Sequence, residues 1–248
     1  MSPTQAPGGA ESRADAYADL VALCARGIDW RLDPSRAITL GPATRPAAVL
    51  VLFGRLDALT ADAPSPAVPS HAVPADLDVL LQRRAGTLGH HAGQVAFPGG
   101  RLEPSEGPVD AALREATEEV GLDVDGVEVL GTLAPLPVPV SNHLVTPVPA
   151  WWVRPSQVAA VDHAETVDVF RLSVADLLDP ANRASVAHTR AGATVRTPAF
   201  VVDDVLVWGF TAIVLSRMFD ALGWAVPWDA RRLVDPAADL VRRSRTAD

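Results

Sequence analysis

The chain has 248 residues and carries 21 basic and 30 acidic side chains, which give a formal charge of −9 at pH 7. This length suits one domain with additions, and the negative charge argues against nucleic-acid binding as the main function, because phosphate contacts depend on positive side chains. All the basic residues are arginines, which excludes both a P-loop lysine and Schiff-base lysine chemistry. The single cysteine, Cys24, excludes an internal disulfide and a thiolate zinc cluster, and the lack of a His-x-x-x-His pair argues against a zinc hydrolase.

The first third of the chain predicts one helix and two strands separated by a long loop. Residues 1–13 have no hydrophobic pattern and are expected to be disordered. Apolar residues at helical spacing predict a helix over Ala14–Ala25, and an apolar, β-branched run predicts a buried strand over Ala47–Phe53. The proline-rich segment 61–76 is expected to be an insertion loop that precedes a strand over Leu77–Arg83. Because no apolar run reaches the length of a membrane span and no secretory signal is visible, we expect a cytoplasmic protein without membrane partners.

The second half of the chain predicts several short strands and two helices. The strand-like runs are rich in β-branched residues and are Val127–Leu133, Thr146–Val153, Thr166–Leu172 and Phe200–Trp208. The helices are expected over Val174–Leu178 and over Thr211–Leu222, the second ending at Gly223. This order predicts a mixed sheet with helices on its faces, in a single domain over 14–228 followed by a C-terminal tail over 229–248.

Between these two parts, one helix gathers negative charge on one side. Pro108 is suited to the first turn of a helix and Gly121 to its C-terminal end. An apolar stripe follows helical spacing, and three carboxylates lie roughly opposite it: the stripe is Val109, Leu113, Ala116 and Val120, and the carboxylates are Glu115, Glu118 and Glu119. Like charges at this spacing destabilise an isolated helix, whereas a divalent cation would bind them, because Mg²⁺ and Mn²⁺ prefer carboxylate oxygens.

Taken alone, such a helix is also typical of a solvated acidic surface. The residues around it favour a site instead. A Gly-Gly pair precedes the helix and allows the backbone to approach a phosphate or a metal closely. Arg114 lies beside the acids and can hold one of them in a fixed position.

The segment 100–122 resembles the Nudix box. The matching residues are Gly100, Glu106, Arg114, Glu115, Thr117, Glu118, Glu119, Val120, Gly121 and Leu122, with Ala116 smaller than the usual aliphatic residue. The resemblance implies an α+β Nudix fold, an α/β/α sandwich around a mixed β-sheet. It also implies an enzyme that hydrolyses a diphosphate linked to another moiety with the help of Mg²⁺ or Mn²⁺.

The same resemblance implies roles for individual residues. Glu115 and Glu119 are expected to bind the metal with assistance from Glu118, and the carbonyl of Gly100 is a further candidate ligand. Arg114 and Glu106 are expected to orient the catalytic glutamates. Glu118 and Glu119 thus serve catalysis as well as metal binding, and Glu165, beyond the box, is a candidate for the catalytic base.

The residues before the box resemble the extended motif of the Nudix coenzyme A pyrophosphatases. The matching positions are Leu80, Leu81, Arg84, Ala85, Leu88, His91, Gly93, Gln94, Val95, Phe97, Pro98, Gly99 and Gly100. The sequence departs from this motif at Gln82, where Thr is usual, and at Gly89, where Arg is usual. The resemblance implies cleavage of coenzyme A, its thioesters or its oxidised forms to 3′,5′-ADP and 4′-phosphopantetheine.

Five residues of this region are candidate substrate contacts. They are Arg83, Arg84, His91, Phe97 and Gly99. Because side chains alternate along a strand, at most one of the two arginines is expected to face the site. His91 is also compatible with a purely structural role.

Two alternatives to coenzyme A hydrolysis stay open. The box does not specify the substrate, so a different nucleoside diphosphate derivative, such as ADP-ribose, or a nucleoside triphosphate is a second enzymatic reading. A non-catalytic Nudix domain that senses a nucleotide is a third reading, although such domains usually lose the box glutamates. Trp151, Trp152 and Trp208 can stack on an adenine or simply pack in the core.

Overall fold

The computed structural model describes residues 16–31, 44–55, 73–74, 76–86, 93–190 and 193–238 of the chain. Several sequence predictions lie outside these residues. They are the disordered start at 1–13, most of the insertion loop 61–76, the contact residue His91 and the departure at Gly89.

The elements follow the predicted order and add strands that were not predicted. The helices are α1 (Ala16–Arg26), α2 (Pro108–Val120), α3 (Val174–Leu178) and α4 (Phe210–Leu222), with short 3-10 turns η3 (Val124–Gly126) and η4 (Pro180–Asn182). The strands are β1 (Arg45–Arg55), β2 (Leu77–Arg84), β3 (Val95–Ala96), β4 (Gly99–Arg101), β5 (Val127–Val129), β6 (Leu136–Val138), β7 (His143–Trp152), β8 (Thr166–Ser173), β9 (Arg183–Arg190), β10 (Ala193–Val202) and β11 (Val205–Val207).

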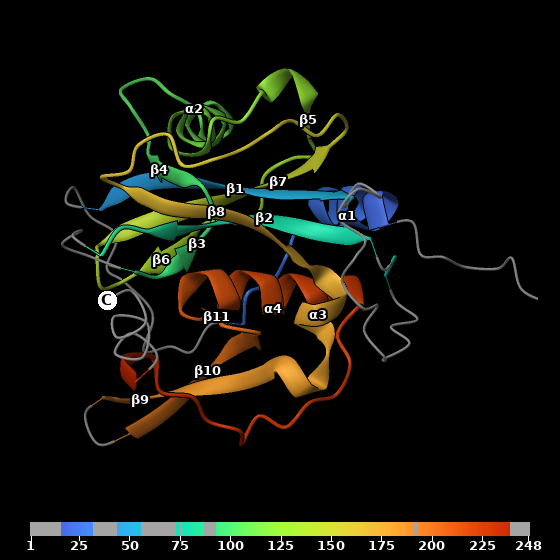
Figure 1. Ribbon diagram of the computed structural model, residues 1–248, viewed down its shortest axis with the longest axis vertical. Coiled ribbons are helices and arrows are strands. Elements are labelled where there is room, and N and C mark those ends of the chain that lie inside the picture. The colour runs from blue at the N-terminus through green and yellow to red at the C-terminus, as the bar shows by residue number, and fades with distance from the viewer. Residues whose placement is uncertain are drawn as a thin grey trace, which may run out of the picture.

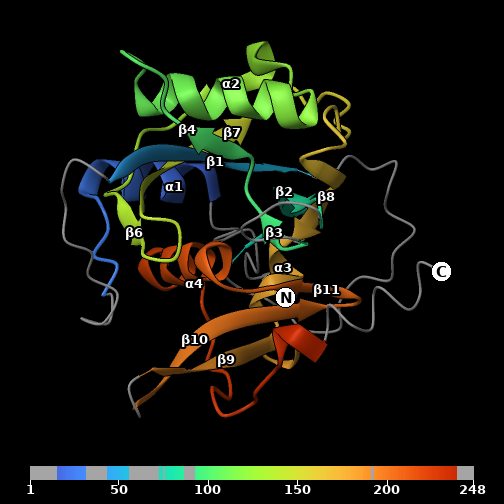
Figure 2. The ribbon, with the colours of Figure 1, turned by 90° about the vertical axis from the view of Figure 1, so that its left-hand side faces the viewer.

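Strand β1 is the centre of the larger sheet, which has eight strands in the part of the chain that the structure describes. It pairs in parallel with β7 and antiparallel with β2 and β4, so this sheet is mixed. Helix α2 covers one face of the sheet, and α4 and α3 lie on the other face (Figures 1 and 2). The predicted α+β fold, an α/β/α sandwich around a mixed sheet, is confirmed.

The side chains of β1 point alternately to two covered faces of the sheet, which explains why its sequence is one continuous apolar run. Ala48, Leu50 and Leu52 belong to the core beneath α2, whereas Val51 and Phe53 belong to the core on the α4 side. Side chains of a strand point to opposite faces in turn, so a strand covered by helices on both faces must be apolar throughout. The two faces of β1 therefore lead to different layers of the molecule.

A second sheet of three strands, β9–β10–β11, lies beyond α4 and was not predicted (Figure 1). The expected single strand over Phe200–Trp208 is wrong. The chain turns back at Asp203, whose φ is +50°, and the residues on either side form the antiparallel pair of β10 and β11. Asp and Asn tolerate this backbone conformation better than most residues, so a two-residue turn is hidden inside an apolar run.

The segment predicted to be a tail from 229 onward takes part in this second sheet. Leu233 forms a parallel bridge with Ser185 of β9, and the Val234 N–H donates to the Ser185 carbonyl at 2.9 Å. Packed structure thus continues past residue 228.

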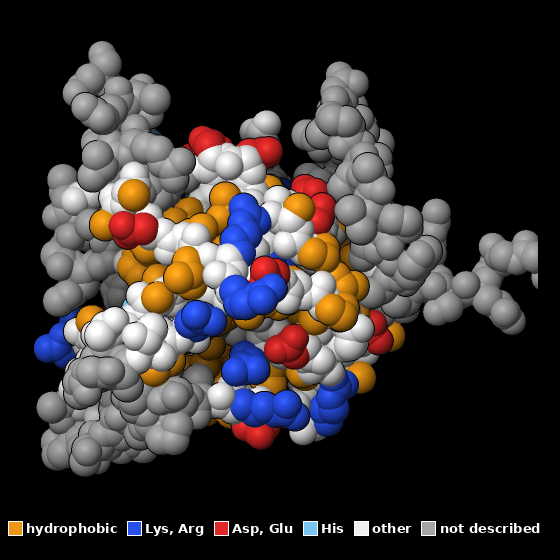
Figure 3. All heavy atoms as spheres, turned by 90° about the horizontal axis from the view of Figure 1, so that it is seen from below, with side chains coloured by type: hydrophobic (Ala, Val, Ile, Leu, Met, Phe, Trp, Pro, Cys, Tyr) orange, Lys and Arg blue, Asp and Glu red, His pale blue; other side chains and the backbone are white. Residues whose placement is uncertain are grey.

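Seen from below, the molecule has arginine side chains gathered over this end (Figure 3). The exposed arginines of this region include Arg196 and Arg231.

The strand expected over Val127–Leu133 is limited to Val127–Val129, and the residues after it run as irregular chain to β6. None of the helices in the described ranges is long and apolar enough to cross a membrane.

Candidate active site

Helix α2 begins and ends as its sequence predicts. Pro108 occupies the first turn, and Gly121 adopts the left-handed conformation with φ of +67° and donates its N–H to the last carbonyls of the helix. The prediction that all three carboxylates lie opposite the buried side is wrong for Glu119, which is only 3 % exposed. Helix α2 lies close over the sheet, so the last turn of the helix directs Glu119 between the two layers.

The Gly-Gly pair belongs to strand β4 and allows its backbone to lie close to this helix. Gly99 has a φ of +154°, and a Cβ atom there would lie 2.3 Å from the Ala48 carbonyl oxygen, so only glycine fits. A Cβ atom on Gly100 would lie 2.2 Å from Oε1 of Glu115. The Glu115 carboxylate therefore rests on the Gly100 backbone, at the place where any other residue would carry a side chain.

Glu119 is held by donors from three segments. Its Oε2 accepts from the Gln82 side-chain amide at 2.6 Å and from the Gly99 N–H at 2.9 Å. A guanidinium nitrogen of Arg84 lies 3.6 Å from its Oε1. Burial raises the pKa of Glu119 to about 7, although these donors oppose the shift. The charged form of Glu119 is thus only partly compensated by the protein.

Gln82 extends this network into the sheet. Its side-chain oxygen accepts from the Thr166 hydroxyl at 2.7 Å while its amide donates to Glu119. Both Gln82 and Thr166 are fully buried. A buried amide that satisfies both of its polar ends fixes its neighbour in one orientation. The departure from Thr at this position thus carries a structural function of its own.

Arg114 connects the remaining acids of the box. Its Nε and Nη2 form two hydrogen bonds with the two oxygens of Glu106, at 2.9 and 3.1 Å. Its Nη1 donates to Glu115 and to Glu118, each at 3.0 Å. Burial raises the pKa of Glu115, and the hydrogen bond from Arg114 opposes that shift. Arg114 therefore positions the glutamates through a fork anchored on Glu106.

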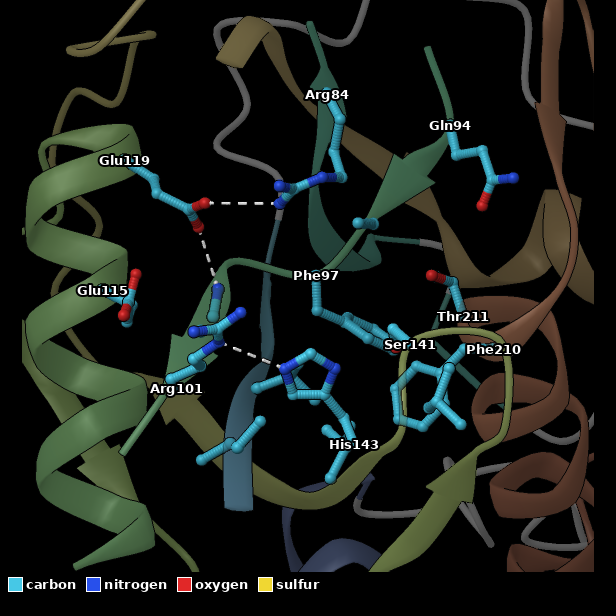
Figure 4. Close-up of a pocket in the computed structure, with 18 of the residues that line it drawn as sticks. Arg84, Gln94, Phe97, Arg101, Glu115, Glu119, Ser141, His143, Phe210 and Thr211 are labelled. Atoms are coloured by element: carbon cyan, nitrogen blue, oxygen red, sulfur yellow. Dashed lines mark hydrogen bonds and ion pairs between the residues drawn. The ribbon is translucent and has the colours of Figure 1, made fainter. Parts of the chain in front are cut away.

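A cavity of about 550 Å³ opens beside these residues (Figure 4). Its volume is within the usual range for a small-molecule site. The residues that line it come from the sheet, from α2 and from the β11–α4 region: Ala47, Ala48, Val49, Arg84, Gln94, Val95, Ala96, Phe97, Gly99, Gly100, Arg101, Glu115, Glu119, Val138, Ser141, His143, Val145, Glu165, Trp208, Phe210 and Thr211. One end of the cavity is thus acidic, and the other end is largely apolar and aromatic.

The structure brings most of the predicted site residues to this cavity. Those that line it are Arg84, Phe97, Gly99, Gly100, Glu115, Glu119 and Glu165. Arg83 does not: its guanidinium lies 5.8 Å from the centre of the Phe170 ring. Glu118 lies on the exposed side of α2, with 60 % of its side chain accessible. Arg114 does not line the cavity but forms an ion pair with Glu115, which does.

Several further residues of the cavity wall were not predicted from the sequence to be site residues. They are Gln94, Arg101, His143, Phe210 and Thr211, together with Trp208, for which stacking was only one reading. Strand pairing assembles part of this wall, because Arg101 pairs with Ala47 and His143 pairs with Arg45 on the two sides of β1. No pattern in the nearby sequence predicts these pairings. The one available signal is that Arg101 and His143 are polar residues at the ends of strands.

The donor set at the acidic end fits a divalent cation. Glu115 and Glu119 line the same cavity from successive turns of α2, and burial raises the pKa of both carboxyls. Carboxylate and carbonyl oxygens are the ligands that Mg²⁺ and Mn²⁺ prefer, and the Gly100 backbone adjoins Glu115. Within the described ranges, no group of three or more Asp, Glu, His or Cys side chains is already placed to hold a metal ion.

The chain is similar to known Nudix proteins. The family model described as the NUDIX domain matches residues 67–190. The protein described as an uncharacterized Nudix hydrolase, NudL, from Photorhabdus laumondii is 36 % identical over 141 residues, which are 56 % of this chain and 74 % of that protein. NudL from Yersinia pestis is 35 % identical over 142 residues, 56 % of this chain and 70 % of that protein. A solved Nudix hydrolase from M. smegmatis, RenU, is similar with a TM-score of 0.46 and 20 % identity, covering 75 % of this chain and 90 % of that one.

The chain belongs to the Nudix family. Its members are diphosphate hydrolases that generally use divalent metal ions, and this protein is an enzyme of that class. The matched region ends at residue 190, so Trp208, Phe210 and Thr211 of the cavity wall lie outside it.

Proposed function

We propose that this Nudix hydrolase cleaves the diphosphate of coenzyme A or its derivatives, giving 3′,5′-ADP and 4′-phosphopantetheine or its acyl form. The observation that carries the proposal is the cavity itself. Arg84, Phe97 and Gly99, which belong to the coenzyme A-type motif, line the same cavity as the Nudix glutamates Glu115 and Glu119. The motif residues are thus in contact with the space where a substrate diphosphate would lie.

The lining of the cavity also supports a bipartite substrate. The acidic end would receive the diphosphate, and the Trp208–Phe210 end offers apolar and aromatic surface for an adjoining group. Gln82, one of the two departures from the motif, is compatible with the proposal, because it holds Glu119 in place through its own hydrogen bonds.

We propose Glu115, Glu119 and the Gly100 carbonyl as the metal ligands, with Glu118 assisting. When bound there, the cation neutralises diphosphate charge and makes a water molecule more nucleophilic. Arg84 would add positive charge for the phosphate oxygens, and its place beside Glu119 supports this role. Arg114 would keep Glu115 and Glu118 in position through its fork on Glu106. Glu165, which lines the cavity, is the proposed acceptor of the proton from the attacking water.

Incubation of the purified protein with a substrate panel tests the proposal. Coenzyme A, acetyl-coenzyme A, ADP-ribose and nucleoside triphosphates are each supplied with Mg²⁺ or Mn²⁺, and products are separated by chromatography. We expect kcat/KM for coenzyme A or its thioester to exceed the values for the other substrates by about tenfold or more, about 1.4 kcal/mol of transition-state discrimination. Preference for ADP-ribose or a triphosphate would contradict the proposal.

A further inference from the structure

Arg101 is a positively charged residue of the cavity lining that is not paired with the glutamates. Two of the described residues that line the cavity are arginines, Arg84 and Arg101. Arg84 lies beside Glu119, whereas Arg101 forms no ion pair with any residue in the described part of the chain. Its Nε donates instead to Nε2 of His143 at 3.3 Å. The two terminal nitrogens of the Arg101 guanidinium are thus available to a ligand.

His143 fixes the direction of this guanidinium. An Nε2 atom that accepts a hydrogen bond belongs to the neutral ring with its proton on Nδ1. Arg101 and His143 lie two strands apart, on either side of β1, and their side chains meet across it (Figure 4). Guanidinium forks recognise phosphate oxygens in pairs, so an arginine held at Nε presents the matching face.

The register of the sheet separates this pair from the carboxylates. Gly100 pairs with Ala48, which faces α2, and Glu115 rests on the Gly100 backbone. Arg101 pairs with Ala47, so its side chain starts on the opposite face, toward α4. Arg101 therefore enters the cavity from the face of the sheet opposite to α2, the helix that carries Glu115 and Glu119.

We propose that Arg101, positioned by His143, binds the 3′-phosphate of coenzyme A. This inference rests on the proposed function, since coenzyme A carries both a diphosphate and a separate phosphate monoester. The other two candidate arginines are engaged elsewhere, because Arg83 lies over Phe170 and Arg84 lies beside Glu119. Arg101 would then select substrates that bear a second phosphate, while the carboxylate helix determines which bond is cleaved.

Binding measured without turnover tests the contact directly. Titration calorimetry compares 3′,5′-ADP with 5′-AMP, which lacks the 3′-phosphate, on the wild type and on Arg101→Gln. We expect Arg101→Gln to weaken 3′,5′-ADP binding by about 10- to 100-fold and to leave AMP binding nearly unchanged, as for one charge-assisted hydrogen-bond pair. Arg196→Gln, which removes the same charge from an exposed site on β10, is the matched control and should change neither affinity.

The role of His143 as a positioning residue is tested by two variants. His143→Gln keeps an acceptor for the Arg101 Nε and should retain most of the preference for 3′,5′-ADP over AMP. His143→Leu removes that acceptor and should lose most of it. Both proteins should unfold at temperatures close to the wild type, which separates lost positioning from lost fold.

Hydrolysis separates failure of this inference from failure of the proposed function. If the wild type does not cleave coenzyme A, the proposed function is wrong. If it does, Arg101→Gln should lower kcat/KM for coenzyme A and leave that for dephospho-coenzyme A within about twofold, because only one substrate carries the 3′-phosphate. Equal losses on both substrates, or no loss on either, would overturn the assignment of Arg101.

Discussion

Glu119 is the most enclosed carboxylate of the site, and its charge is the property that catalysis is expected to need. Glu119→Gln keeps the size of the side chain and an oxygen that can accept from Gln82 and Gly99. We expect kcat to fall by roughly two orders of magnitude or more, since a metal ligand and its charge are lost. Steady-state kinetics with Mg²⁺ checks this, with Glu103→Gln, an exposed carboxylate outside the cavity, as the control. Wild-type turnover by a folded Glu119→Gln protein would remove Glu119 from the metal site.

The same carboxyl should make the metal-free protein less stable as the pH rises. The pKa of Glu119 is about 7 in the folded protein, against 4.5 for an ordinary glutamate. Between these values the folded state holds a proton that the unfolded state has released, so stability is lost as the pH rises from about 4.5 to 7. The contribution is at most about 3 kcal/mol. Urea unfolding in a chelator should show a flatter pH profile for Glu119→Gln than for the wild type, and parallel profiles would contradict the shift.

The two neighbouring glycines should respond differently to the same change. In Gly99→Ala the new methyl meets the Ala48 carbonyl, and φ of +154° strains the backbone, so we expect a loss of about 1–3 kcal/mol or more. In Gly100→Ala the three atoms nearest to the new methyl all belong to the Glu115 carboxylate, a side-chain end that can move away. The second variant should therefore remain folded and lose most of its activity. Thermal unfolding and turnover, measured together, distinguish the two, and an active Gly100→Ala would argue against Glu115 as a ligand.

At the scale of elements, the end of the second sheet and the start of α4 supply a wall of the cavity that the matched family region lacks. Phe210, at the first turn of α4, faces the cavity and also packs partly on the core. Phe210→Ala should raise KM for coenzyme A about 5- to 30-fold with little change in kcat, since apolar contact is made equally in the ground and transition states. Phe210→Leu, which keeps apolar surface, should show a smaller rise. A fall in kcat at unchanged KM would place Phe210 near the reacting atoms instead.

Elements with strong local signals were predictable, and elements made by distant pairing were not. Contiguous residues predict α2, through its proline and glycine ends, and β1, through its apolar run. Both elements are found where they were expected. The hairpin at Asp203 was hidden because both of its strands are apolar and its turn is only two acidic residues long. Arg101 and His143 meet only because β4 and β7 flank β1, and that register has no counterpart in the nearby sequence.

At the scale of the whole molecule, two distant parts of the chain supply different sides of one cavity. Helix α2, on one face of the larger sheet (Figure 2), carries the Nudix glutamates, and Trp208, Phe210 and Thr211, between the end of β11 and the first turn of α4, line the same cavity. The sequence predicted the first part through the box, because its residues are contiguous. It did not predict the second part, because Trp208 and Phe210 lie about ninety residues further along the chain and reach the cavity only through tertiary packing.

The central claim is that the site cleaves the diphosphate bridge of coenzyme A and leaves the 3′-phosphate in place. Hydrolysis in ¹⁸O-labelled water, followed by mass spectrometry of the products, tests it most directly. We predict 3′,5′-ADP and 4′-phosphopantetheine as the products, with one ¹⁸O atom incorporated per cleavage into a phosphate of one of them. Release of inorganic phosphate together with dephospho-coenzyme A would contradict the account.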